Sequence, residues 1–338
     1  MNKYILINIQ KTLIALVSLV ASVFVSAHHS HSNLDRNNIQ QHRGVVTEYS
    51  WKSPHVFIKV SAPNQAGEVV EYSIELLHPP AMQRRGWSKD SYKPGDSITW
   101  EGASDKNPNR YYSGLNWSQR GDGQFFGQDL EEEEINPSKD FTGTWVRDLR
   151  GGEGTYYPPK GWPLTALAQN EVDNFAVEQN PALQCEEQGP PKATTLPYPI
   201  KISRPDENRI LMDYELRSGS RVIYLKDAPE PGEPTMWGYS LGRFEGDELV
   251  VETNNFVAQR WGNATGINSS EAKNLVERFK LTNGGMSLEM AMTISDPMYL
   301  SEPFTFEYYL SKIQDREFVD VECSTESARL YLEGGYSD

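Results

Sequence analysis

The chain has 338 residues, with 47 aspartates and glutamates against 32 lysines and arginines, and its formal net charge is −15. A surface this acidic repels phosphate backbones and anionic lipid headgroups, which argues against nucleic-acid binding and membrane-surface binding. At roughly 100–200 residues per domain, the length predicts two domains.

The first 27 residues have the three parts of a secretion signal. Lys3 and Lys11 give a basic start, residues 12–25 are apolar, and small side chains at 26–27 mark a cleavage point. The apolar run is shorter than the roughly 20 residues that a membrane-spanning helix needs. We therefore expect a cleaved signal peptide over residues 1–27 and a mature protein in the periplasm or outside the cell, without membrane insertion.

The N-terminal part of the mature chain predicts a small barrel. Residues 28–38 are polar and predict an irregular arm that carries histidines. Runs of β-branched and aromatic residues then predict five short strands and, before Gly86, one short helix, with the following bounds: strands at 45–49, 56–60, 69–76, 97–101 and 111–118, and a helix at 79–85. This pattern is typical of an OB-like Greek-key barrel, here over residues 28–128.

The remainder of the chain predicts a second, larger β domain. Residues 129–140 form an acidic run that predicts a linker. Over residues 141–338 the pattern predicts one short helix near 165–179 and about eight antiparallel strands, at 210–216, 221–225, 236–245, 248–253, 275–281, 287–294, 304–309 and 317–322. Strands at this spacing favour a barrel or a strongly curved sheet. The fold class is therefore all-β.

The chain contains two cysteines, Cys185 and Cys323. In an oxidising compartment an even pair is expected to form a disulfide. The alternative is two buried free thiols.

Several motifs in the N-terminal part resemble one known family. They are Ala27-His28-His29-Ser30, Trp51-Lys52-Ser53-Pro54-His55, Arg84-Arg85-Gly86-Trp87 and Lys93-Pro94-Gly95-Asp96. Over residues 25–127 the chain resembles an exported bacterial domain of unknown function, family 6152, whose usual pattern is Ala-His-His-Ser-Phe, Asn-Pro-His and a Gly-Asp turn. The chain departs from it at His31, where an aromatic is usual, and at Ser53, where asparagine is usual. The family implies no reaction.

The C-terminal part is similar to another group of uncharacterised exported proteins, through residues 237–253 and 277–279. Its start, Phe141-Thr142-Gly143-Thr144-Trp145, resembles the Gly-x-Trp strand of lipocalin-like barrels. This resemblance implies a closed antiparallel barrel.

All six histidines lie between residues 28 and 78, and the first of them predicts a metal site. If the signal is cut before His28, the free amine and the ring of this residue can hold one metal ion. His55, at the start of a strand, is our candidate for a third nitrogen, which would complete a copper site. His29 and His31 are candidates to assist.

Other interpretations of the histidines are open. A cut after Ser26 would place His29 third in the mature chain, in a square-planar chelate for copper or nickel. Alternatively, His28 and His29 form a disordered tail and His55 is a structural residue bonded to backbone. His42 and His78 are interpreted as surface or turn residues.

A second hypothesis is a carrier of a small apolar ligand. Trp145, Trp237, Tyr239 and Phe244 would line the interior of the larger barrel, although aromatic residues of this kind more often form core. Catalysis is not predicted: Gly238-Tyr239-Ser240-Leu241-Gly242 resembles a nucleophile elbow, but no histidine follows it to complete a triad. The sequence therefore predicts an exported binding protein for a metal ion, copper favoured, or a small molecule. A copper-dependent oxidase stays a third possibility.

Overall fold

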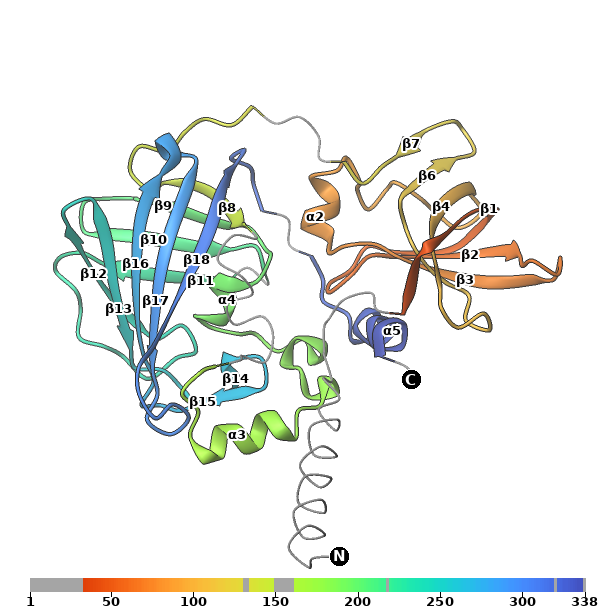
Figure 1. The fold of residues 1–338 in the computed structure, drawn as a ribbon. Helices are drawn as coiled ribbons and strands as arrows, with labels where there is room; N and C mark the ends of the chain where they lie inside the picture. The colour runs from red at the N-terminus through yellow and green to blue at the C-terminus, as the bar shows by residue number, and fades with distance from the viewer. Residues whose placement is uncertain (1–32, 130–133, 149–160, 217–218, 319–320, 337–338) are drawn as a thin grey trace, which may run out of the picture.

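Two closed β-barrels of unequal size make up most of the molecule, and the helix α5 lies between them (Figure 1). The computed structural model describes residues 33–129, 134–148, 161–216, 219–318 and 321–336. The predicted signal peptide and His28, His29 and His31 lie outside the described residues. No helix in the described ranges is long and apolar enough to cross a membrane.

The smaller barrel has the strand order of an OB fold. Its strands and helix are β1 (Leu34–Ser50), β2 (Phe57–Pro63), β3 (Val69–Glu75), α2 (Pro79–Gln83), β4 (Ser97–Asp105), β5 (Tyr112–Gly114), β6 (Trp117–Arg120) and β7 (Phe125–Phe126). The order β1-β2-β3-β5-β4 is closed by pairing of β1 with β4, and β3 pairs with β5 in parallel. The prediction of an OB-like barrel is confirmed.

In the small barrel, β4 and β5 meet at a backbone contact that only glycine permits. Gly102 in β4 lies against Gly114 in β5, and a Cβ added to Gly102 would lie 1.7 Å from the Gly114 carbonyl oxygen. The core beside this contact holds large aromatic side chains, including Trp87 and Trp100, which are at most 1% exposed. Close backbone approach therefore lets a short fifth strand complete the barrel.

Two local predictions for this barrel were wrong. The segment from Leu34 belongs to β1 and not to an irregular arm, because it pairs with β4 up to Asp105 and buries the Leu34 side chain. The single strand expected at 111–118 is divided into β5 and β6. The turn between them is fixed by the Asn116 amide, which donates a 2.8 Å hydrogen bond to the Glu101 carbonyl.

The larger barrel has nine strands in the order β10-β11-β12-β13-β16-β17-β18-β8-β9. Their bounds are β8 (Gly143–Arg147), β9 (Ile200–Ser203), β10 (Arg209–Tyr214), β11 (Gly219–Tyr224), β12 (Tyr239–Glu245), β13 (Glu248–Asn254), β16 (Asn274–Thr282), β17 (Ser287–Ser295) and β18 (Phe304–Ile313). Eight of these pairings are antiparallel, and β11 and β12 pair in parallel. The predicted all-β architecture is confirmed.

Smaller elements cover one end of this barrel. They are α3 (Ala166–Asp173), two 3₁₀ helices (Val177–Gln179 and Pro181–Gln184), α4 (Lys192–Thr195) and the hairpin β14 (Gln259–Ala264) and β15 (Ile267–Ser269). The helix expected near 165–179 is present as α3, which Thr165 begins by accepting a hydrogen bond from the Ala168 amide.

The C-terminal end of the chain differs from the prediction. The described part of the segment expected as a strand at 317–322 makes no ladder, and the helix α5 (Thr325–Tyr336) follows it. This segment runs between the domains, where the Ser53 amide donates to the Glu322 carbonyl at 3.1 Å and the Ser324 amide donates to the Ser53 carbonyl at 3.0 Å. The β-like composition of this segment therefore belongs to an extended connection between the domains and not to a strand of the barrel.

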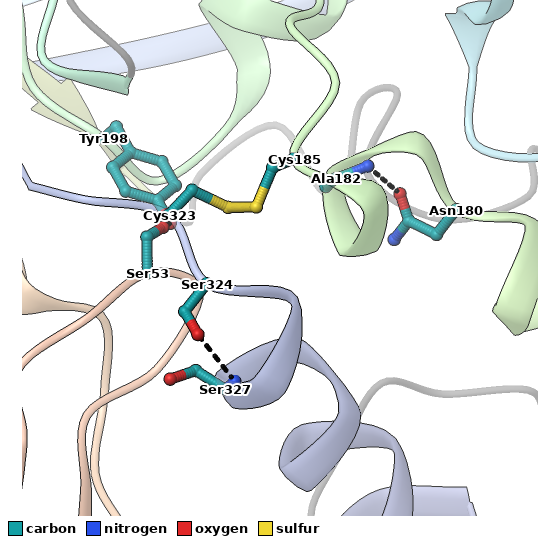
Figure 2. The surroundings of a disulfide bond; sticks show 8 residues. All are labelled: Ser53, Asn180, Ala182, Cys185, Tyr198, Cys323, Ser324 and Ser327. Atoms are coloured by element: carbon teal, nitrogen blue, oxygen red, sulfur yellow. Dashed lines mark hydrogen bonds between the residues drawn. A yellow bond between two sulfur atoms is a disulfide. The ribbon is translucent and has the colours of Figure 1, made fainter.

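A disulfide and α5 hold the two domains together. Cys185 and Cys323 are bonded, as predicted, and the bond lies beside Ser53 and Tyr198 (Figure 2). On α5, Leu330 packs against a buried cluster of the small barrel that contains Phe57, and Ala328 packs against Leu183 of the large domain. The helix thus contacts apolar side chains of both domains.

We expect Gly102→Ala to destabilise the small barrel by roughly 2–3 kcal/mol, because the new Cβ overlaps the backbone of β5. Denaturant unfolding monitored by tryptophan fluorescence measures the change. Gly127→Ala is the control, since a Cβ there meets only ordinary contacts, the nearest at 3.5 Å. Equal stability of the two variants would contradict the close approach.

The variant with both Cys185→Ser and Cys323→Ser should lose roughly 2–5 kcal/mol of unfolding free energy, because the bond closes a loop between residues 138 apart in sequence. Urea titrations with and without a reductant test this. The reductant should lower the midpoint of the wild type and leave that of the variant unchanged. A wild type that does not respond to full reduction would refute the expectation.

Candidate functional site

A pocket of about 100 Å³ lies between the two domains, next to the disulfide-linked segment. The small barrel contributes Ser53, Pro54, His55 and His78. The large domain contributes a mostly polar wall that includes Asn180, Glu186, Gln188, Lys192, Tyr198 and Thr265. Several of these side chains can exchange protons or bind ions, so this pocket is the candidate site.

His55 lines the pocket, and the buried carboxylate of Glu75 holds its ring. Its ring Nδ1 bonds to Glu75, whose other carboxylate oxygen accepts a hydrogen bond from the Tyr112 hydroxyl. The strand register explains the contact: Phe57 is opposite Glu75, so His55 and Glu75 are diagonal neighbours on one face of the β2–β3 pair. Glu75 is 4% exposed.

This contact fixes the orientation of the His55 ring. A carboxylate accepts hydrogen bonds, so Nδ1 carries the proton and, in the neutral ring, Nε2 carries the lone pair. Glu75 is itself held by Tyr112 on β5, which is parallel to β3. His55 is thus bonded to a side-chain carboxylate, whereas the interpretation of a structural histidine named a backbone partner.

His78 is buried in the pocket wall and not on the surface, which corrects the sequence interpretation. It begins α2: its Nδ1 accepts a 3.4 Å hydrogen bond from the Ala81 amide. Its ring packs on Tyr198 of the large domain, with ring centroids 4.4 Å apart. Burial, followed by the neighbouring His55, lowers the pKa of His78 to about 3. The ring is therefore neutral near pH 7, with its proton on Nε2.

The large domain brings a buried lysine into the same pocket. Lys192, on α4, is 3% exposed, and its amine donates a hydrogen bond to the Thr265 hydroxyl in the β14–β15 turn. Burial lowers the pKa of Lys192 to about 7. No sequence signal identified this residue, because α4 is a short helix in a region rich in proline and glycine.

The six histidines do not all meet at this site. His55 and His78 line the pocket together. His42 lies on β1, where its ring stacks on Trp100 at 4.9 Å, so it is neither at a turn nor in the pocket. Within the described ranges, no group of three or more histidine, cysteine, aspartate or glutamate side chains is placed to hold a metal ion.

The four aromatic residues expected to line the large barrel lie in different surroundings. Trp145 is fully buried in the core, and its ring nitrogen donates to the Phe141 carbonyl at 2.9 Å. Trp237 is partly buried against that core. Tyr239 donates to the Pro229 carbonyl, and Phe244, opposite Leu249 near the end of β12, is 45% exposed. These four side chains do not gather around one cavity.

Comparison with known proteins connects the small barrel to one family. Residues 15–115 match the family of unknown function DUF6152, which agrees with the motifs. No curated protein matches the chain. Among solved structures, the chain is similar to a luciferase domain from the dinoflagellate Lingulodinium polyedrum, at 13% identity and a TM-score of 0.26, over 60% of this chain and 50% of that one. The chain thus spans about half of that structure, and a similarity at this level carries no argument about function.

The buried amine of Lys192 predicts a distinct pH dependence of stability. Because its folded-state pKa lies near 7 and its unfolded value near 10.5, the unfolded chain binds more protons between these values. Unfolding free energy should therefore rise with pH in this window, by up to roughly 5 kcal/mol from this group.

We expect Lys192→Met to remove this rise, so that the difference between wild type and variant grows from pH 7 to 10. Chemical denaturation at several pH values measures it. Lys226→Met, which removes a lysine that is 64% exposed, is the control and should leave the slope unchanged. Parallel curves for wild type and Lys192→Met would contradict a buried amine.

Proposed function

We propose that this protein, whose residues 15–115 match the family of unknown function DUF6152, is an exported binding protein that holds a copper ion through His28 and His55. His29 and His31 are the assisting ligands. In this proposal, cleavage of the signal after Ala27 provides the amine of His28.

The observation that carries the proposal is the bond from His55 Nδ1 to buried Glu75. Histidines that bind metals generally donate their second ring N–H to a carboxylate or carbonyl, which fixes the ring and makes the ligating nitrogen more basic. Glu75 and Tyr112 act in this way on His55, and they direct Nε2 to the metal.

The path of the chain supports the pairing of His28 with His55. The described chain begins beside Leu34, which packs in one cluster with Phe57, two residues from His55, and with Tyr112, the partner of Glu75. Leu34 is six positions after His28, and in extended form this segment spans at most about 20 Å. The mature N-terminus can therefore reach His55.

The chemistry of the ligands favours copper. An amine and two imidazole nitrogens suit copper(II), which binds nitrogen donors in a planar arrangement more tightly than zinc does. His78 is not among the proposed ligands, because its Nδ1 caps α2 and its Nε2 carries the proton. One imidazole thus comes from the barrel and one from the arm.

Copper binding to the mature protein, purified after export, tests the proposal. Sequencing should find His28 at the N-terminus, and competition with a chelator should give one tight site. His55→Ala should weaken copper binding by more than about a hundredfold, and Glu75→Gln by about 10- to 100-fold. His42→Ala, which removes a histidine outside the pocket, should have no effect.

Any of three results would refute the proposal. The mature chain could begin at a residue other than His28, the wild type could lack a tight copper site, or the His42→Ala and His55→Ala variants could bind copper with equal affinity. A small apolar molecule that copurifies with the protein and does not depend on His28 would instead support the carrier hypothesis.

A further inference from the structure

The pocket between the domains contains an amide that lacks partners. Gln188 is 6% exposed and lines the pocket, and neither Nε2 nor Oε1 of its side chain has a hydrogen-bond partner among the described residues. Buried amides are nearly always satisfied, because an unsatisfied group loses its hydration without replacement. Gln188 therefore offers one donor and one acceptor to a molecule in the pocket.

A basic group lies in the same pocket. Lys192 has a buried amine, and Thr265 accepts one of its hydrogen bonds. A carboxylate bound beside this amine would favour its protonated form, which donates hydrogen bonds to an anion. Asn180 and the Nε2–H of His78 add further polar groups to the wall.

The wall that carries these groups is closely packed. Gly189, next to Gln188, packs so closely that an added Cβ would lie 1.9 Å from the Met236 carbonyl oxygen. Cys185, three residues before Gln188, is tied to Cys323. These contacts constrain the backbone on both sides of Gln188, which reduces the conformational entropy that the chain loses on binding.

The pocket volume of about 100 Å³ has room for a small ligand. A carboxylate accepts hydrogen bonds from the Lys192 amine and from Gln188 Nε2, and a neighbouring hydroxyl donates to Gln188 Oε1. We propose that this pocket binds a small 2-hydroxycarboxylate, of the size of lactate. The proposal goes beyond copper binding and does not depend on it.

Calorimetry and saturation-transfer NMR with lactate on the mature protein, with metal removed by a chelator, test the proposal. Lactate should bind to the protein. Propionate, which lacks the hydroxyl, should bind about fivefold more weakly than lactate, and lactamide, which lacks the charge, should bind about tenfold more weakly. Lys192→Met should reduce lactate affinity about tenfold or more, and Gln188→Leu about fivefold.

Two controls separate this site from folding effects and from the copper site. Gln119→Leu, at an exposed position on β6, and Lys226→Met should bind lactate as the wild type does. A protein with one extra residue before His28 should lose tight copper and still bind lactate. If copper binding fails in the wild type and lactate binding persists, only the copper proposal is refuted.

Gln188→Glu provides a second test, because its carboxylate repels an anion in a pocket of unchanged shape. It should abolish lactate binding while the thermal midpoint stays close to that of Gln188→Leu. The proposal is overturned if lactate does not bind, if lactate and propionate bind equally, or if the Gln188 and Lys192 variants bind lactate like the wild type. A pocket that holds only ordered waters at high lactate concentration would also overturn it.

Discussion

The arrangement of the two barrels depends on the connection between Cys185 and the segment around Cys323. Each barrel closes on itself through its own strand pairings and does not need the other. The disulfide, the backbone bonds of Ser53 and the helix α5 bring a barrel edge that carries two histidines against a wall that carries a lysine. The pocket exists only because these contacts fix one domain on the other.

The buried polar groups in this pocket depend on one another for stability. A buried carboxylate, imidazole or amine is costly in a medium of low dielectric constant unless partners satisfy it. Glu75 has two such partners, and burial lowers the pKa of both His78 and Lys192, which favours their neutral forms. A site assembled in this way is a good environment for ligands that bring charge or hydrogen-bonding groups with them.

Periodic apolar patterns predicted most strands of both barrels, because alternation along a strand is a local property. The number of short strands and the single helix indicated the OB-like barrel, and the structure gave its strand order. The same reasoning failed for residues 317–322, which have a strand-like composition but connect the two domains. It also missed α5, whose apolar side chains contact both domains. His55 was identified as a site residue from its place before a strand. Its partner Glu75 was not, because cross-strand register decides which carboxylate faces the ring.

By itself, the sequence determined the all-β class, a small barrel followed by a larger one, the clustering of histidines before residue 79, and a pair of cysteines suited to a bond. Only the tertiary structure decided that His78 is buried against Tyr198, that Lys192 and Gln188 meet these histidines, and that His42 does not. The physical reason is separation along the chain. Residues more than a hundred positions apart share a pocket through strand register, a covalent bond and domain packing, and none of these is encoded in a local pattern.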